Sequence, residues 1–166
     1  MLNTGGLRTS IEPGTVTYED FFAVLPFENQ AVVVECSAQQ VVALMRRSIN
    51  TCGEYGALIP GGLRVEFRRR DCSVEPGDDN HSELVSIQAH DGSVLYPLPE
   101  GASTSTYRVV TLDFLAKGGS GYEAFGDCRQ VGSLGNLRQL LAHHFKDAHF
   151  EWGDAVDGRF RDLKPL

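Results

Sequence analysis

The sequence predicts an α+β fold in which a mixed, largely antiparallel sheet is packed with helices. Strand patterns and helix patterns follow one another irregularly along the 166 residues, without the regular alternation of a doubly wound parallel sheet. Asp91-Gly92 separates two short alternating segments, which indicates a tight hairpin. A chain of this length can bury a sizeable core, so we expect a single domain over residues 1–166.

The first strand and the helix after it are predicted most clearly. Residues 31–36 are apolar except for Glu35 and contain three successive β-branched valines, which indicates a buried strand. Ser37 follows, with Gln40 three positions later, a capping-box pattern for the start of a helix. We expect this helix to end near residue 49, with Gly53 as its stop signal. The apolar positions that share its buried face are Val41, Leu44, Met45 and Ile49.

Four more strands are predicted in the middle of the chain. Apolar and charged side chains alternate over residues 63–68, as in a half-exposed strand. Residues 85–89 and 94–96 alternate on either side of Asp91-Gly92, which is expected to form a two-residue turn. Residues 107–111 have the pattern of another strand.

The end of the chain is expected to carry one more helix and a short strand. Ser133 is placed to cap this helix. Its apolar face would consist of Leu134, Leu137, Leu141 and Phe145. After Asp154 the sequence is mostly polar, and the apolar positions Phe160 and Leu163 predict a short closing strand.

Composition and charge argue against several classes of protein. The hydrophobic content of 42% and charged content of 22% are ordinary for a globular domain. No apolar segment approaches the roughly 20 residues of a membrane span. The net charge of −7 argues against nucleic acid, which requires clustered Lys and Arg. The basic run Arg68-Arg69-Arg70 is followed by Asp71, so we expect a solvated strand end. Residues 1–6 are expected to be an internal segment and not a signal peptide.

The cysteine and histidine patterns do not predict a metal site. Four cysteines occur without a C-x-x-C pair: Cys36, Cys52, Cys72 and Cys128. An even number permits two disulfides, but a domain of this size does not need cross-links and Cys36 lies in an apolar run, so we expect four free cysteines. His143 and His144 diverge by about 100° on a helix and cannot easily share one ion with His149.

Three segments carry a resemblance to a known family. They are residues 2–8 (LNTGGLR), residues 24–29 (VLPFEN) and residues 107–122 (YRVVTLDFLAKGGSGY). In this order and at these separations they resemble the C-terminal, substrate-binding domain of the 5'-nucleotidases and of their UDP-sugar hydrolase and 2',3'-cyclic phosphodiesterase relatives. The resemblance covers nearly the whole chain and implies the fold of that domain.

The resemblance implies a nucleoside site in this chain. Two aromatic rings clamp the base in that family, and the matching positions are Phe27 and Phe114. Stacking is worth about 1–3 kcal/mol per base and does not demand one hydrogen-bond pattern. Asn3 and Arg8 match the asparagine and arginine of the family's glycine-rich segment. An amide can bond a base, and a guanidinium offers phosphate oxygens a planar fork.

Two positions depart from the family's pattern. Gly118, Gly119 and Ser120 match a substrate-binding loop, but relatives usually carry an aspartate at the position of Ser120. That carboxylate accepts hydrogen bonds from ribose hydroxyls, whereas serine is shorter and neutral. Thr4 stands where glycine is usual, which predicts a slightly different backbone path beside Asn3.

The family's catalytic metals lie in a separate N-terminal domain, whose Asp, His and Asn motifs do not occur in this sequence. The resemblance therefore implies a dimetal site, with ions such as Zn or Mn, in that missing domain. It implies no catalytic or metal-ligating residue here, and binding without catalysis by this chain alone. The implied partners are a small-molecule nucleotide or nucleoside and the chain's own N-terminal metallophosphatase domain. Family members are often periplasmic, cell-surface or secreted, and some are intracellular.

Two function classes stay open at this level. One is the substrate-binding half of a hydrolase acting on 5'-nucleotides, 3'-nucleotides, cyclic nucleotides or UDP-sugars, which the motifs do not distinguish. The thiosulfate-cycle hydrolases that share this architecture belong to the same open class. The other is a divergent domain that has lost nucleoside binding and serves as an interaction or structural module, with Ser120 as its main support. Ligand titration on the chain separates the two.

Overall fold

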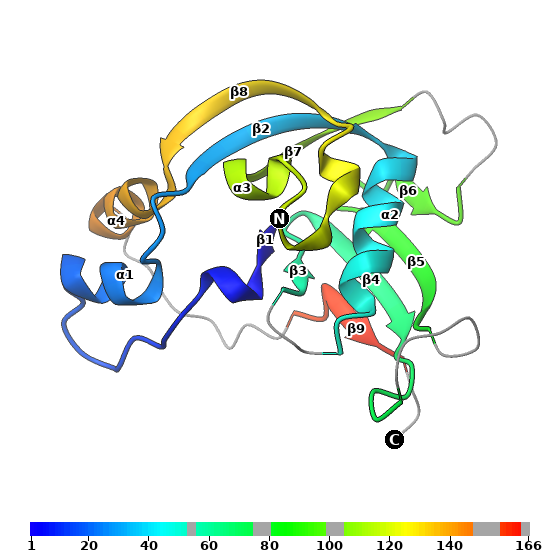
Figure 1. Ribbon diagram of the computed structural model, residues 1–166, viewed down its shortest axis with the longest axis horizontal. Coiled ribbons are helices and arrows are strands. Elements are labelled where there is room, and N and C mark those ends of the chain that lie inside the picture. Colours follow the sequence, from blue (N-terminus) through cyan, green and yellow to red (C-terminus); the bar gives the residue numbers. More distant parts are fainter. Residues whose placement is uncertain (53–55, 75–80, 99–104, 148–156, 164–166) are drawn as a thin grey trace.

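The computed structural model describes residues 1–52, 56–74, 81–98, 105–147 and 157–163 (Figure 1). The strands in these ranges are β1 (Leu2–Asn3), β2 (Gln30–Ser37), β3 (Leu58–Ile59), β4 (Leu63–Arg68), β5 (Glu83–Ala89), β6 (Val94–Tyr96), β7 (Thr106–Leu112), β8 (Arg129–Asn136) and β9 (Phe160–Asp162). The helices are α1 (Tyr18–Val24), α2 (Ala38–Ile49), α3 (Asp113–Ala116) and α4 (Leu137–Asp147), with 3-10 turns η1 (Thr4–Gly6), η3 (Gly119–Gly121) and η4 (Glu123–Phe125).

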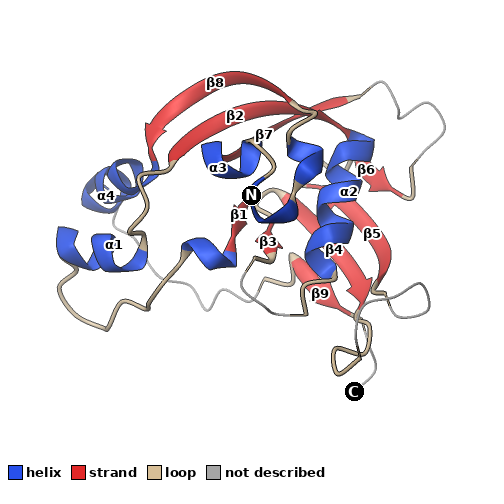
Figure 2. Ribbon diagram, in the orientation of Figure 1, coloured by secondary structure: helices blue, strands red, loops and turns tan. Residues whose placement is uncertain are grey.

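The strands form three sheets with the orders β1-β3, β7-β2-β8 and β6-β5-β4-β9. Among the described residues every pair is antiparallel except β4 with β9, which is parallel. Helices and strands are interspersed without regular alternation (Figure 2). This confirms the predicted α+β class with a mixed, largely antiparallel sheet arrangement.

Helix α2 holds the two larger sheets together. It contacts β2 of the three-stranded sheet and both β5 and β6 of the four-stranded sheet. Its predicted apolar face is buried, and one contiguous core joins it to Val34 of β2 and Ile87 of β5. Helix α3 contacts β2, and β2 and β8 curve above it in Figure 1. Helices α1 and α4 contact each other at one end of the molecule (Figure 1).

The start of α2 is the predicted capping box. The Ser37 hydroxyl accepts a hydrogen bond from the Gln40 amide at 3.2 Å, and the Gln40 side chain accepts one from the Ser37 amide at 2.7 Å. These bonds satisfy two donors that the first helical turn leaves unpaired. The helix ends at Ile49 with Asn50 as its C-cap, and Gly53 lies outside the described residues.

Replacement of Ser37 by alanine is expected to lower the free energy of unfolding by about 1 kcal/mol, because the cap acceptor is lost. Urea unfolding of the variant measures this loss. Ser10→Ala, at an exposed position outside the regular elements, is the matched control and should leave the midpoint unchanged. A midpoint that Ser37→Ala does not move would show that the cap contributes nothing.

The hairpin between β5 and β6 turns where predicted but has one more loop residue than expected. The Ala89 amide donates to the Ser93 carbonyl at 2.8 Å, and the Gly92 amide donates to the Ala89 carbonyl at 2.9 Å. The loop therefore consists of residues 90–92. Gly92 has φ of 87°, the left-handed residue that closes three-residue hairpins of this kind.

The predicted start of the last helix was wrong. Strand β8 continues through Asn136, so Ser133 lies in the strand opposite Val32. Asn136 is the cap instead, because its side-chain oxygen accepts a hydrogen bond from the Gln139 amide at 3.1 Å. Leu134, which continued the helical spacing, is 51% exposed on the strand.

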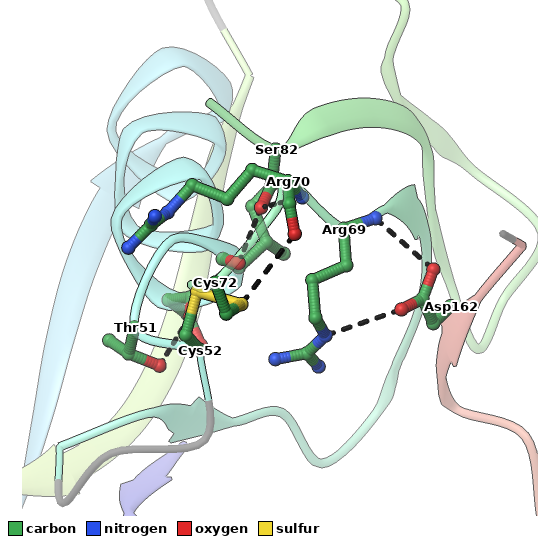
Figure 3. A network of polar contacts seen from close by, with 9 residues as sticks. Thr51, Cys52, Arg69, Arg70, Cys72, Ser82 and Asp162 are labelled. Carbon is green, nitrogen blue, oxygen red and sulfur yellow. Dashed lines mark hydrogen bonds and ion pairs between the residues drawn. A yellow bond between two sulfur atoms is a disulfide. The ribbon is translucent and has the colours of Figure 1, made fainter. Parts of the chain in front are cut away.

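The expectation of four free cysteines was also wrong. Cys36 is bonded to Cys128 and Cys52 to Cys72. Strand pairing explains the first bond, because Glu35 is opposite Arg129 on antiparallel strands and the next positions are Cys36 and Cys128. The second joins the residues after α2 to the residues after β4 (Figure 3).

The closing strand and the basic run meet at the edge of the four-stranded sheet. The rings of Phe67 and Phe160 are 4.9 Å apart, so β9 is the predicted closing strand, although Asp154 lies outside the described residues. Arg69 donates from its backbone and side chain to the Asp162 carboxylate at 3.1 and 3.2 Å (Figure 3). Arg68 pairs with Glu83 at 2.9 Å. Arg68 and Arg69 are thus bonded to carboxylates on neighbouring strands. The expectation of a solvated strand end did not include these ion pairs.

Candidate functional site

Four of the seven predicted site residues line one pocket. The pocket has a volume of about 260 Å³, and its lining residues are Asn3, Gly5, Gly6, Phe27, Asn29, Gly56, Phe114 and Ser120. They come from β1 and η1, the loop before β2, the segment before β3, helix α3 and η3. The three segments singled out in the sequence therefore meet in space.

The two rings of the pocket are only half covered by protein. Phe27 is 49% exposed and Phe114 is 48% exposed, whereas Phe67 and Phe125 are buried in the core. Both rings could have been core residues, which is the usual place of phenylalanine. Instead they present apolar surface to one pocket, where a planar ligand could stack.

Asn3 brings a hydrogen-bonding group to the same pocket. The residue is 7% exposed, and its side-chain oxygen is buried without a hydrogen-bond partner among the described residues. A buried acceptor without a partner costs stability, unlike one that is bonded. A ligand with an N–H or O–H group would satisfy this oxygen.

A buried polar network holds the backbone around Asn3. The Ser48 hydroxyl bonds both the amide and the carbonyl of Leu58 at 2.9 Å, which fixes β3 opposite β1. Thr4, the departure noted above, accepts a hydrogen bond from the Gly56 amide at 3.2 Å. The Tyr122 hydroxyl donates to the Gly56 carbonyl at 2.6 Å, and burial raises the pKa of this hydroxyl above its ordinary value, which keeps it a donor.

Ser120 lies at the exposed rim of the pocket in an unusual backbone conformation. Its φ and ψ are 57° and 23°, in the left-handed region that few residues other than glycine, asparagine and aspartate enter readily. Gly118 before it also has a positive φ, of 86°. Such geometry is typical of loops whose position is fixed for function.

Gly119 lies directly against Phe114. A Cβ at this position would come within 2.5 Å of the ring and 2.6 Å of the Phe114 carbonyl oxygen. Any larger residue must displace the ring, the loop or both. Gly119 thus does not line the pocket but leaves the room that the Phe114 ring occupies.

Gly119→Ala is therefore expected to shift the Phe114 ring and to cost about 1–3 kcal/mol of stability through overpacking. Ring signals from labelled phenylalanine in NMR spectra report the shift, and urea unfolding reports the cost. Gly61→Ala is the control, because a Cβ there meets nothing within 4 Å. Unchanged Phe114 signals in the Gly119 variant would contradict the close approach.

Arg8 and Gly118 are not among the lining residues. Arg8 is exposed, and its amide donates to the Val24 carbonyl at 2.9 Å, which ties the glycine-rich segment to the end of α1. Its guanidinium is predicted to bind phosphate, which in a bound nucleotide would lie outside a pocket that holds the base. The substrate-binding roles of Arg8 and Gly118 stay predictions.

Four other residues line the pocket: Gly5 and Gly6, which belong to the LNTGGLR segment, and Asn29 and Gly56, which were not expected there. Asn29 lies inside the VLPFEN segment, so the motif contained the signal and its polar last residue could have been named. Gly56 is in no motif and reaches the pocket only through the pairing of β1 with β3.

The lining residues are all uncharged, so the pocket offers aromatic faces, amides and a hydroxyl. Among the described residues no group of three or more His, Cys, Asp or Glu side chains is placed to hold a metal ion, and His149 lies outside them. None of the helices in the described ranges has the length and apolar character to cross a membrane.

The chain is similar in sequence to proteins named as 5'-nucleotidases. The probable 5'-nucleotidase of Treponema pallidum (strain Nichols) is 32% identical over 131 residues, which are 75% of this chain and 20% of that protein. The human 5'-nucleotidase is 29% identical over 133 residues, 76% of this chain and 22% of that protein. The chain therefore spans about a fifth of the length of these relatives.

Solved structures with a similar fold also include nucleotidases. The crystal structure of a 5'-nucleotidase precursor from Thermus thermophilus matches with a TM-score of 0.78 and 25% identity, over 99% of this chain and 31% of that one. The NAD nucleotidase of Haemophilus influenzae shares the fold, with a TM-score of 0.70 and 24% identity, over 98% of this chain and 29% of that one. Residues 1–127 match the family model described as "5'-nucleotidase, C-terminal domain". The chain belongs to the 5'-nucleotidase C-terminal domain family.

Proposed function

We propose that this chain is the nucleoside-binding domain of a 5'-nucleotidase-type phosphohydrolase and clamps a base between Phe27 and Phe114. The observation that carries the proposal is that two half-exposed rings from distant segments line one pocket together with Asn3. Neither ring is buried in the core and the two are not on opposite faces, either of which would have argued against a clamp.

The pocket suits a nucleoside in size and chemistry. Its volume of about 260 Å³ lies just below the roughly 300–1,000 Å³ of small-molecule sites. A base between the rings requires roughly 7 Å between their planes, twice a stacking contact. The unpartnered oxygen of Asn3 would accept a hydrogen bond from the base, and Ser120 at the rim would face the ribose.

The rest of the reaction is assigned to a second domain. We propose that residues 1–166 form one domain, which the single contiguous core of the described residues supports. A dimetal site in an N-terminal metallophosphatase domain would supply the activated water and the Lewis acid. This chain would hold the base and ribose so that the phosphate reaches that site, with Arg8 near the phosphate, which is a contribution of proximity.

The test is a calorimetric titration of the purified chain with adenosine. We expect weak binding, with a Kd of about 1 mM, because adenosine carries no phosphate and the metal–phosphate contacts of a nucleotide would lie in the other domain. The chain should release no phosphate from AMP, with or without Zn²⁺, Mn²⁺ or Mg²⁺. Absence of adenosine binding would favour the alternative of an interaction or structural module, which the serine at position 120 supports.

Ser120→Asp is expected to tighten adenosine binding by roughly tenfold, since hydrogen bonds to a charged acceptor are worth about 1.5–3 kcal/mol. Aspartate tolerates the left-handed backbone at this position, so the variant should fold normally. The control ligand is 2',3'-dideoxyadenosine, which lacks the 2' and 3' hydroxyls of the ribose and should show no gain. An equal gain for both ligands would show that the carboxylate does not act on the ribose.

A further inference from the structure

We infer that Arg138 and Asp113 are positioning residues that set the spacing of Phe27 and Phe114. The inference rests on the proposed function, because it assigns these side chains to the clamp. Neither residue lines the pocket. Each joins a segment that carries a clamp ring to an element distant in sequence.

Arg138, near the start of α4, is buried to 3% exposure and holds the Phe27 segment. Its Nε donates to the Leu25 carbonyl at 2.9 Å, and its Nη2 donates to the Phe27 carbonyl at 3.2 Å. The same Nη2 bonds the Glu28 carboxylate at 3.0 Å. One planar fork therefore grips three parts of a short segment that has no helix or strand of its own.

The burial of this guanidinium is well compensated. Glu28 balances its charge, and the Phe22 ring lies beneath it with 3.5 Å between the guanidinium carbon and the ring centroid. A buried arginine with several hydrogen bonds has little freedom to move. The Phe27 backbone is thus anchored to α4, although the Phe27 ring itself is 49% exposed.

Asp113 supplies the corresponding link on the other side. It is the residue before Phe114, and its Oδ1 accepts a hydrogen bond from the Gln30 amide at 3.0 Å. Gln30 begins β2, three residues after Phe27. This bond joins the side chain of the residue before Phe114 to the backbone three residues after Phe27, next to the pairing of Ala31 with Leu112.

The two anchors hold the backbone segments that carry the two half-exposed rings. Phe27 is held against α4 through Arg138, and the strand that follows Phe27 is held against α3 through Asp113. Stacking on both faces of a base tolerates little variation in the gap between the two rings, because dispersion contacts fall off within an ångström. Loss of either anchor should therefore weaken base binding while the pocket residues stay the same.

The experiment compares Asp113→Asn with Asp113→Ala and adds Arg138→Lys. Asparagine keeps the Oδ1 acceptor, whereas alanine removes it; lysine keeps the charge and the stem but not the fork. We expect adenosine binding to weaken roughly tenfold for Asp113→Ala and Arg138→Lys, as for a small misplacement of binding groups, and to be restored within about twofold by Asp113→Asn. Arg129→Lys, at an exposed arginine paired with Glu35, is the control and should leave binding unchanged.

Ring signals of labelled phenylalanine in the ligand-free chain separate this inference from the proposed function. Asp113→Ala and Arg138→Lys should shift the signals of Phe27 and Phe114 and leave those of the buried Phe125 in place, which also shows that the variants are folded. If the wild type binds no adenosine, the proposed function fails and these signals alone decide the positioning role. Ring signals that stay unchanged in the variants would overturn the inference. If the wild type binds adenosine, variants that bind it with the same affinity would overturn it as well.

Discussion

Replacing Cys36 and Cys128 together by alanine is expected to lower the free energy of unfolding by about 4–5 kcal/mol, the largest stability loss that we predict. The two cysteines are 92 residues apart, and a cross-link over so long a loop removes much conformational entropy from the unfolded chain. Such a loss is a large part of the roughly 5–15 kcal/mol that stabilises a typical domain.

The second disulfide provides the internal comparison. Cys52 and Cys72 are 20 residues apart, so their replacement by alanine should cost only about 3 kcal/mol. Both double variants are unfolded in guanidinium chloride without reductant and compared with the wild type. A larger loss for the Cys52–Cys72 variant would contradict the account based on loop length.

Phe114→Ala should have the largest effect on binding. Loss of one stacking face is expected to weaken adenosine binding by about 1–3 kcal/mol, roughly 5- to 150-fold. Because the ring is 48% exposed, its removal should cost less stability than the roughly 3–5 kcal/mol lost on deleting a buried phenylalanine. Calorimetric titration and urea unfolding measure the two quantities.

Phe125→Ala is the matched control for this prediction. Phe125 is in the same stretch of chain but has no exposed surface, so its removal should cost the full core value. Phe114→Ala should therefore lose more binding and less stability than Phe125→Ala. If Phe114→Ala left binding unchanged while the wild type bound adenosine, the ring would have no part in the site.

Local patterns predicted the elements that depend on local interactions. The α2 helix was placed correctly because its capping box and apolar spacing are both contained in residues 37–49. Strands β2, β4 and β7 followed from runs of apolar or alternating side chains. The start of α4 was wrong because Leu134 fits a helical spacing as well as it fits a strand, and pairing with β2 decides between them.

Contacts that depend on the pairing of distant strands could not be predicted from local sequence patterns. The Cys36–Cys128 bond depends on the register of β2 with β8, and Gly56 reaches the pocket through the pairing of β1 with β3. Arg138 has no motif that marks it, and only its burial against the Phe27 segment shows what it contacts. By contrast, the motifs single out Asn3, Phe27, Phe114 and Ser120, which line one pocket, and their role in binding stays a prediction.

The most direct test of the clamp is a nuclear Overhauser experiment on the chain with adenosine, using ring-labelled phenylalanine. We expect contacts from the adenine protons to the rings of both Phe27 and Phe114, with no contact to the buried ring of Phe125. Contacts to only one of the two pocket rings, or to neither while adenosine binds, would contradict the proposal that this domain holds a base between them.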